Sequence, residues 1–332
     1  MRQRIIVLVS IVLLLAMPLT MAFASGEKEA EGGTGEPFIG VSVPSADHGW
    51  TAAVIDYAEE AVNELPIRGR VLTAADVNQQ SNDVEDLMAQ GVDAITILPL
   101  EGDPLTPAAK SVLDQGIPLV NFDRELGDEA YTALVKGDNR GIGENAGKWL
   151  VEELDGEGKV FMLSGPPVSV TTQRNDGFMS AIEGSDIEIV GKQDGGYQRE
   201  KGYQVMQNAL TANPEIDAVF SIDDEMSLGA LQAIKEAGRT DIKYLTGAGG
   251  QKDFFEAIMN EDRRTFEGHT IELASFMYQP DMIKDAIEVT MQIVNGNPPD
   301  WYEEGESVTQ VIPAARVDAG NVEEYYDEDA PY

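Results

Sequence analysis

Charged residues follow two of the apolar segments in this sequence, at the point where each segment ends. The run Leu119–Phe122 leads directly into Asp123 and Arg124, and the run Ala218–Ile222 leads into Asp223. Apolar runs this short predict strands that are buried on both faces. The carboxyl ends of strands in an open α/β sheet lie at the ligand crevice, so we expect a binding site there. A surface salt bridge is the alternative for Asp123 and Arg124, because charged pairs mark functional sites only statistically.

Further polar and aromatic residues stand beyond other predicted strands. Asp47, His48 and Trp50 follow the first strand, Arg174 lies on a later helix, and Tyr197 follows a Gly-Gly pair. Carboxylates accept hydrogen bonds from vicinal hydroxyls, and arginine donates to hydroxyl or ring oxygens. An aromatic face covers the C–H side of a sugar ring, and concave sites use a few polar groups to orient the ligand. This mixture of residues predicts a neutral, polyhydroxylated ligand.

Each of these residues also has an ordinary structural explanation. Asp47 can be the N-cap of the following helix, and Trp50 can belong to the core. Tyr197 can rest on the surface, and Arg174 can be a solvated helix charge. Asp223 can cap the helix that begins near Met226, although we expect its neighbour Asp224 to do so.

Strands and helices alternate along the chain, which predicts right-handed βαβ units and parallel sheets. The expected strands are Phe38–Pro44, Arg70–Ala75, Ala94–Leu98, Leu119–Phe122, Tyr131–Val135, Lys159–Leu163, Ile187–Gln193, Ala218–Ile222, Lys243–Thr246, Thr270–Tyr278 and Val308–Pro313. The expected helices are Trp50–Leu65, Asn82–Gln90, Pro107–Gln115, Arg140–Leu154, Thr172–Ile182, Glu200–Ala212, Met226–Ala237, Lys252–Met259 and Pro280–Val294.

We therefore predict an α/β fold of two doubly wound parallel-sheet lobes joined by a multi-crossover hinge, since two sheets are more usual than one very wide sheet. The N-terminal lobe is expected to comprise residues 37–137 and 279–306, and the C-terminal lobe residues 138–278 and 307–316. Crossovers are expected near Gly137, Tyr278 and Ser307, with an acidic tail at 317–332.

The first residues have the pattern of an export signal. Arg2 and Arg4 precede an apolar run that is short for a membrane span, and Ala22 and Ala24 suit cleavage after residue 24. An uncleaved anchor helix is the alternative. The Gly- and Glu-rich residues 25–36 predict a disordered linker. We expect a periplasmic protein, and not a lipoprotein, because no cysteine stands at the cleavage site.

Composition excludes several classes of site and partner. The 332 residues contain no cysteine and two histidines, which excludes thiolate chemistry and leaves little room for a histidine-rich metal site. We expect no cofactor and no metal. The formal net charge of −36 repels nucleic acid and anionic lipid, so we expect neither as a partner. The charge is spread over the chain, which suggests adaptation to a salty habitat, where ions screen it.

One segment matches a dinucleotide-binding fingerprint. Gly141, Gly143 and Ala146 give the pattern G-x-G-x-x-A at a helix start. The next strand ends in Ser164 and lacks the acidic residue that holds the ribose of NAD. Close packing of the helix Arg140–Leu154 explains the small residues better than nucleotide binding.

From Phe38 to about Pro313 the chain resembles the ribose/galactose-type periplasmic sugar-binding proteins, whose periplasmic binding protein-like I fold also occurs in effector domains of LacI-type regulators. The segments that carry the resemblance are Val77-Asn-Gln-Gln, Gln90-Gly-Val-Asp-Ala-Ile95, Gly116-Ile-Pro118, Phe122-Asp-Arg124, Gly137-Asp-Asn139, Arg174-Asn-Asp-Gly-Phe178, Met206-Gln-Asn-Ala-Leu210, Ala218-Val-Phe220, Asp224-Glu-Met226 and Leu228-Gly-Ala230.

The resemblance implies a set of ligand-binding residues. Asp123 and Arg124 would bind sugar hydroxyls from the first lobe, and Arg174, Tyr197 and Asp223 from the second. Asp47–Trp50 would form the family's ligand loop, and Tyr278 stands where ribose-type members carry a glutamine. Gly247-Ala-Gly-Gly250 lacks the family's aspartate, so Gln251 is the candidate to replace it, and Leu98 and Asp223 stand where asparagines are usual. Ribose itself is therefore one candidate among pentoses, hexoses and polyols.

These observations predict a non-enzymatic, monomeric solute-binding protein of an ABC importer, which binds a sugar or polyol by hinge closure and meets a permease in the inner membrane. The alternatives are a binding protein that serves a chemoreceptor or sensor kinase, and a secreted α/β enzyme that acts on a sugar. The export signal and the missing helix-turn-helix argue against a LacI-type repressor.

Overall fold

The computed structural model describes residues 35–46 and 49–332. The predicted signal peptide, residues 1–24, lies outside the described residues, as does the predicted linker except Gly35 and Glu36. Residues Glu36–Tyr332 form one compact unit. Among the described residues, no helix is long and apolar enough to cross a membrane.

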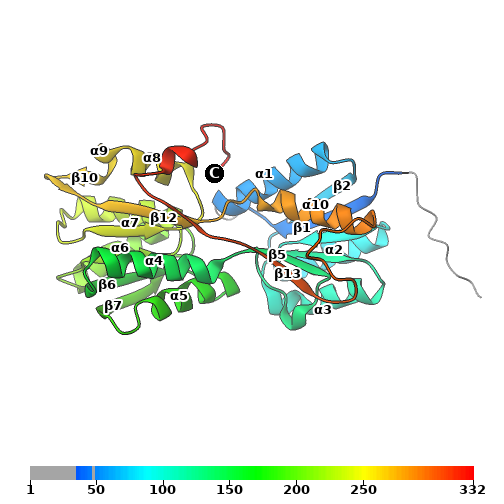
Figure 1. The fold of residues 1–332 in the computed structure, drawn as a ribbon, viewed down its shortest axis with the longest axis horizontal. Coiled ribbons are helices and arrows are strands. Elements are labelled where there is room, and N and C mark those ends of the chain that lie inside the picture. Colours follow the sequence, from blue (N-terminus) through cyan, green and yellow to red (C-terminus); the bar gives the residue numbers. More distant parts are fainter. Residues whose placement is uncertain (1–34, 47–48) are drawn as a thin grey trace, which may run out of the picture. The chain divides into compact units, whose positions relative to one another are not determined.

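A six-stranded, fully parallel sheet forms the first lobe (Figure 1). Its strand order is β13-β5-β4-β3-β1-β2, where the strands are β1 (Phe38–Pro44), β2 (Arg68–Ala74), β3 (Ala94–Ile97), β4 (Leu119–Phe122), β5 (Ala133–Gly137) and β13 (Val308–Ile312). Helix α1 packs beside α10, and α2 packs beside α3. These elements are α1 (Gly49–Glu64), α2 (Val77–Ala89), α3 (Gly102–Asp114) and α10 (Met282–Val294), with the short helix η1 (Gly127–Glu129). The apolar runs of β1, β3 and β4 are buried throughout, as their sequences predict.

A second six-stranded sheet forms the second lobe, in the order β14-β12-β9-β8-β6-β7. All neighbours are parallel except β14, which runs antiparallel to β12. The strands are β6 (Glu157–Ser164), β7 (Asp186–Asp194), β8 (Ala218–Ser221), β9 (Tyr244–Gly247), β12 (Glu272–Met277) and β14 (Ala315–Val317). The other elements are α4 (Asn139–Glu153), α5 (Ser169–Ala181), α6 (Arg199–Ala212), α7 (Asp224–Glu236), α8 (Lys252–Met259), α9 (Glu261–Arg264), the hairpin β10 (Thr265–Phe266) and β11 (His269–Thr270), and η2 (Val322–Glu324).

Three crossovers join the lobes, and one differs from the prediction. The chain passes from β5 to α4 after Gly137 and from β12 to α10 through Tyr278, as expected. The third crossover follows Ile312, because β13 pairs with β5 and so belongs to the first lobe. The assignment of residues 307–316 to the second lobe was therefore wrong for β13. Only Ala315–Val317 joins the second sheet, through β14.

Small residues bring α4 and α5 into close contact. A Cβ atom on Gly143 would lie 1.9 Å from the carbonyl oxygen of Arg174, and one on Gly177 would lie 2.2 Å from that of Arg140. Gly143 of the fingerprint-like segment thus serves helix packing, as we expected, whereas Gly141 lies against its own cap residue Asp138. This close contact sets the position of the Arg174 backbone on α5 relative to α4.

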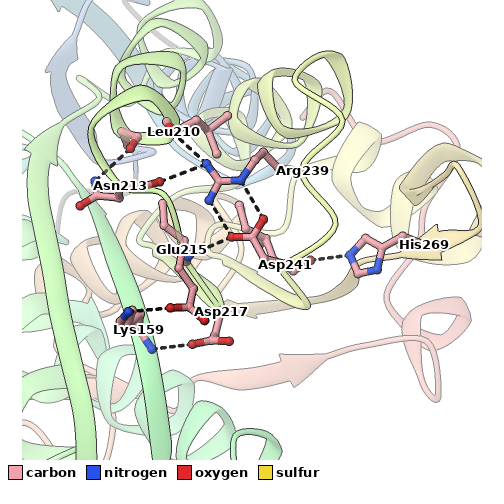
Figure 2. A network of polar contacts seen from close by, with 11 residues as sticks. Lys159, Leu210, Asn213, Glu215, Asp217, Arg239, Asp241 and His269 are labelled. Atoms are coloured by element: carbon pink, nitrogen blue, oxygen red, sulfur yellow. Dashed lines mark hydrogen bonds and ion pairs between the residues drawn. The ribbon is translucent and has the colours of Figure 1, made fainter.

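Polar contacts tie the loops at the amino ends of β6, β8 and β9 (Figure 2). Lys159 Nζ lies 2.6 Å from a carboxylate oxygen of Glu215, and the Arg239 guanidinium pairs with Asp241 at 2.6 Å. The His269 ring contacts the backbone oxygen of Ile242 at 2.6 Å. This edge is opposite to the carboxyl ends of the strands, so the network has a structural role.

The residues predicted as an acidic tail, 317–332, are packed against the second lobe. Val317 is the last residue of β14, and η2 contacts α8. Val322 and Tyr332 are buried. Apolar residues spaced among the acids anchor this segment.

Candidate ligand-binding site

A cavity lies at the carboxyl ends of strands from both sheets. Its free volume is about 30 Å³, well below the roughly 300–1,000 Å³ of most small-molecule sites, so the lobes of this arrangement leave little room between them. The described residues that line it are Trp50, Asp123, Arg124, Val168, Val170, Arg174, Tyr197, Asp223, Ala248, Gly249 and Tyr278. The structure therefore brings seven of the ten predicted site residues around one space.

The turn after β4 presents Asp123 and Arg124. Asp123 has a φ of +55°, in the left-handed region, and its side chain is buried. The buried Asn121 fixes this turn, since its Nδ2 donates to the Arg124 carbonyl at 2.8 Å and its Oδ1 accepts from the Leu126 N–H at 2.9 Å. Arg124 Nη1 donates to the Leu100 carbonyl at 3.2 Å. The Asn121 side chain thus holds the turn, and a backbone carbonyl holds the Arg124 guanidinium.

Arg174 is the buried cation of the second lobe, with 6% of its surface exposed. Its Nε donates to Asn139 Oδ1 at 2.9 Å, its Nη1 to the Ile222 carbonyl at 2.7 Å, and its Nη2 to the Tyr278 hydroxyl at 3.2 Å. A guanidinium has five N–H groups, so these three bonds leave two for a ligand.

The Tyr278 hydroxyl links Asp123 of the first lobe to Arg174 of the second. It donates to Asp123 Oδ1 at 2.6 Å, accepts from Arg174, and lies 2.8 Å from Asn139 Oδ1. Burial first, and then the Asp123 carboxylate, raise the pKa of Tyr278 well above 10, so the phenol remains neutral. Its ring packs on Gly137, where a Cβ would lie 1.8 Å from the ring. Two of the crossovers therefore meet at this residue.

Asp223 lines the cavity as expected, but Asp223 and not Asp224 caps α7. Asp223 caps α7, accepting from the Met226 N–H at 3.0 Å, and it also lines the cavity. Asp224 accepts from the N–H groups of Gly250 and Gln251 at 2.8 and 2.9 Å and from Ser275 Oγ at 2.9 Å. Burial raises the pKa of each carboxyl to about 7. Asp223 is therefore the one that faces the cavity, while Asp224 holds the loop after β9.

Aromatic rings and valines supply the apolar wall. Trp50 stacks on Phe122 with ring centres 6.1 Å apart and meets Tyr278 edge-on at 6.4 Å. Tyr197, at a φ of +57°, places its hydroxyl 2.5 Å from Thr171 Oγ1. Trp50 and Tyr197 are each 8% exposed, so they belong to the core and to the cavity wall at once.

Three predicted residues are not placed at the cavity. Asp47 and His48 lie outside the described residues. Gln251 caps α8, where its Oε1 accepts from the Phe254 N–H at 2.8 Å and its Nε2 donates to Glu225 at 3.1 Å. Gln251 is not among the residues that line the cavity, so the structure does not support it as a replacement for the family's aspartate.

The sequence analysis also missed residues of the site. Asn139 holds Arg174 and Tyr278, yet in sequence it reads as an ordinary helix start after Asp138. Val168 and Val170 carry no polar signal, and Ala248 and Gly249 contribute only small surfaces. Among the described residues, no group of His, Cys, Asp and Glu side chains could hold a metal ion.

The chain is similar to known sugar-binding proteins. It is 32% identical to the ribose import binding protein of Bacillus subtilis, over 89% of this chain and 94% of that protein. It is 34% identical to a galactofuranose-binding protein of Escherichia coli, over 75% and 80% of the two chains. A solute-binding protein of Bacillus halodurans, solved with bound myo-inositol, matches with a TM-score of 0.78 and 27% identity over 91% of this chain and all of that one.

Residues 39–298 match the family described as "Periplasmic binding protein domain". This match spans most of the chain, and the two-lobed α/β architecture agrees with it. The chain belongs to the periplasmic binding protein family.

Proposed function

We propose that this protein is an exported solute-binding protein that captures a neutral monosaccharide or polyol between its lobes and delivers it to an ABC importer. The observation that carries the proposal is the buried chain of contacts Asp123–Tyr278–Arg174, which joins a carboxylate of the first lobe to a guanidinium of the second at the cavity wall. The similar proteins support a sugar or polyol as the ligand, because their names and titles give ribose, galactofuranose and myo-inositol.

The charges of the cavity favour a neutral ligand. Its described wall holds two carboxylates, Asp123 and Asp223, and two guanidiniums, Arg124 and Arg174. An anionic ligand would be repelled by the carboxylates, and a cationic ligand would be repelled by the guanidiniums. Either repulsion would cost binding free energy, because charges buried in the cavity are poorly screened. A polyhydroxy compound can donate to the acids and accept from the arginines at the same time.

Binding is proposed to proceed by hinge closure. The groups that line the cavity come from both lobes, so a ligand that bonds to both favours the closed arrangement by its differential affinity. The permease in the inner membrane would then recognise surfaces of both lobes. The ligand leaves unchanged, because the protein is proposed to act as a receptor and not as an enzyme.

A sensory role is the second candidate. The fructose-binding periplasmic domain of a hybrid two-component system matches this chain with a TM-score of 0.75 and 27% identity over 87% of this chain. The same binding domain can therefore serve a sensor kinase. Loss of radiolabelled sugar uptake on deletion of the protein supports transport, and retained uptake with loss of a sugar-induced transcript supports sensing.

A calorimetric panel tests the proposal. D-ribose, D-galactose, D-allose, xylitol and myo-inositol are titrated into the protein beside two charged analogues, D-galacturonate and D-galactosamine. We expect at least one neutral compound to bind and to raise the melting temperature by mass action, and mass analysis to recover it intact. Binding of the charged analogues alone, or conversion of the sugar, would contradict the proposal.

A further inference from the structure

The segment that follows β14 returns to the cavity. We call residues 318–332 the C-terminal strap; in Figure 1 it is the red segment whose end lies between α8 and α1. Lys252 Nζ, on α8, donates to the carbonyls of Glu328 and Ala330 at 3.1 and 2.9 Å. The Tyr326 hydroxyl donates to Glu256, also on α8, at 3.2 Å. The strap is therefore fastened to the second lobe.

Tyr332 fills the seam between the two lobes beside the cavity. A Cβ on Gly49, the first residue of α1, would lie 2.8 Å from Tyr332 Cε2. A Cβ on Gly249 would lie 3.1 Å from the Tyr332 hydroxyl and 3.8 Å from Trp50 Cδ1. Gly249 and Trp50 both line the cavity. Tyr332 is carried by the second lobe and contacts the first. It packs beside Gly249 but is not among the residues that line the cavity, and it borders a neighbouring pocket with Gly250 and Lys252.

The Tyr332 hydroxyl is buried, and no described residue pairs with it. The residue is 5% exposed, and its oxygen makes no hydrogen bond in the part of the chain that the structure describes. Burial first, and then Asp223, Asp224 and Glu225, raise the pKa of Tyr332 well above 10, so the hydroxyl keeps its proton. A buried hydroxyl without a partner destabilises a fold and is rare. It needs a partner, and the described residues supply none.

We propose that Tyr332 is a ligand-binding residue, which closes the cavity with its ring and gives its hydroxyl to a hydroxyl of the bound sugar or polyol. This inference rests on the proposed function and adds a specificity-determining residue to it. The part of the cavity wall formed by Ala248 and Gly249 has no polar side chain. The neighbouring Gln251 uses its amide oxygen to cap α8. Tyr332 supplies the polar group at that wall from a distant part of the sequence.

The first test compares Tyr332→Phe with Tyr326→Phe, a matched change in the same strap whose hydroxyl pairs with Glu256 away from the cavity. Calorimetry uses the compound of the panel that binds the wild type most tightly. We expect Tyr332→Phe to weaken binding about 5- to 10-fold, the factor for one neutral hydrogen bond, and Tyr326→Phe to leave it unchanged. The melting temperature of Tyr332→Phe should not fall below that of the wild type, because this change removes a hydroxyl that has no partner among the described residues.

Equal affinity of Tyr332→Phe and the wild type would overturn the inference. Tighter binding would also overturn it, because the ring would then occupy the ligand's space. A purely structural role predicts a lower melting temperature with normal affinity, which contradicts it as well.

The second test needs no ligand. Small-angle scattering compares the ligand-free wild type with Tyr332→Ala and Tyr326→Ala. We expect a larger radius of gyration for Tyr332→Ala alone, since the lobes lose a contact that spans them. An unchanged radius would overturn the closing role. If no compound of the panel binds the wild type, the proposed function fails, while the scattering result still decides whether Tyr332 joins the lobes.

Discussion

Replacing Asp223 by asparagine should stabilise the protein while weakening its binding site. Asp223 is 4% exposed and caps α7 through the Met226 N–H. Asparagine caps helices as well as aspartate does, so Asp223→Asn keeps the cap and removes only the charge. The change therefore separates the cost of burying a carboxylate from its use at the cavity.

The magnitude follows from the raised pKa. Burial is the largest cause that raises the pKa of Asp223 from 3.8 to about 7, with Asp224 adding to it, while the Met226 N–H and Arg174 act in the opposite direction. The folded state therefore holds a proton between about pH 4 and pH 7 that the unfolded state has lost. Stability is highest below that window and falls by about 4 kcal/mol as the pH rises through it. Asp223→Asn should recover up to this amount at pH 8.

Urea unfolding at pH 5 and pH 8 measures the effect. The matched control is Asp76→Asn, an exposed N-cap whose Oδ1 accepts from the Gln79 N–H at 2.9 Å, which should change stability by less than about 0.5 kcal/mol. We expect Asp223→Asn to be the more stable protein at pH 8 and to bind the sugar more weakly. It should lose only part of its pH dependence, because Asp224, whose pKa is also raised to about 7, remains. A destabilised variant at pH 8 would refute the reasoning, because the carboxylate would then contribute net stability.

Three further predictions use other parts of the structure. Arg124→Ala should abolish the sugar-induced thermal shift with little change in the ligand-free melting temperature, and retained binding would exclude Arg124 from the site. Gly143→Ala should cost about 1–3 kcal/mol in urea and weaken binding, because its methyl would lie 1.9 Å from the Arg174 carbonyl; Gly147→Ala, which meets the Ala181 side chain at 2.7 Å, should weaken binding less. With a net charge of −36, the melting temperature should rise between low salt and about 1 M salt, and a flat series would contradict the salt hypothesis.

The sequence predicted the elements well where local signals agree. Strands β1 and β4 and helix α8 have the predicted bounds, because apolar runs there end at proline, at a charged residue or at a cap. Helix α3 begins earlier than predicted, at Gly102, since Pro107 lies inside the helix and not in its first turn. The strand β13 alternates between half-buried and exposed residues, so its sequence could not reveal that it pairs with β5.

The site was predictable to the extent that topology decides it. Asp123, Arg174 and Asp223 come together because the carboxyl ends of parallel strands lie at one edge of each sheet. That Asp224 does not cap α7 depends on the path of the loop after β9, whose N–H groups it accepts from and for which the sequence has no signal. Tyr332 lies in a stretch of acidic residues, and its place in the seam depends on contacts with α8 that only the folded chain creates.

The crystal structure of the protein with its tightest-binding neutral sugar or polyol is the most direct test of the account. We predict ligand hydroxyls within hydrogen-bonding distance of Asp123 and Arg124 from the first lobe and of Arg174 and Asp223 from the second. A ligand bound outside this cavity, or held by side chains of one lobe alone, would contradict the account.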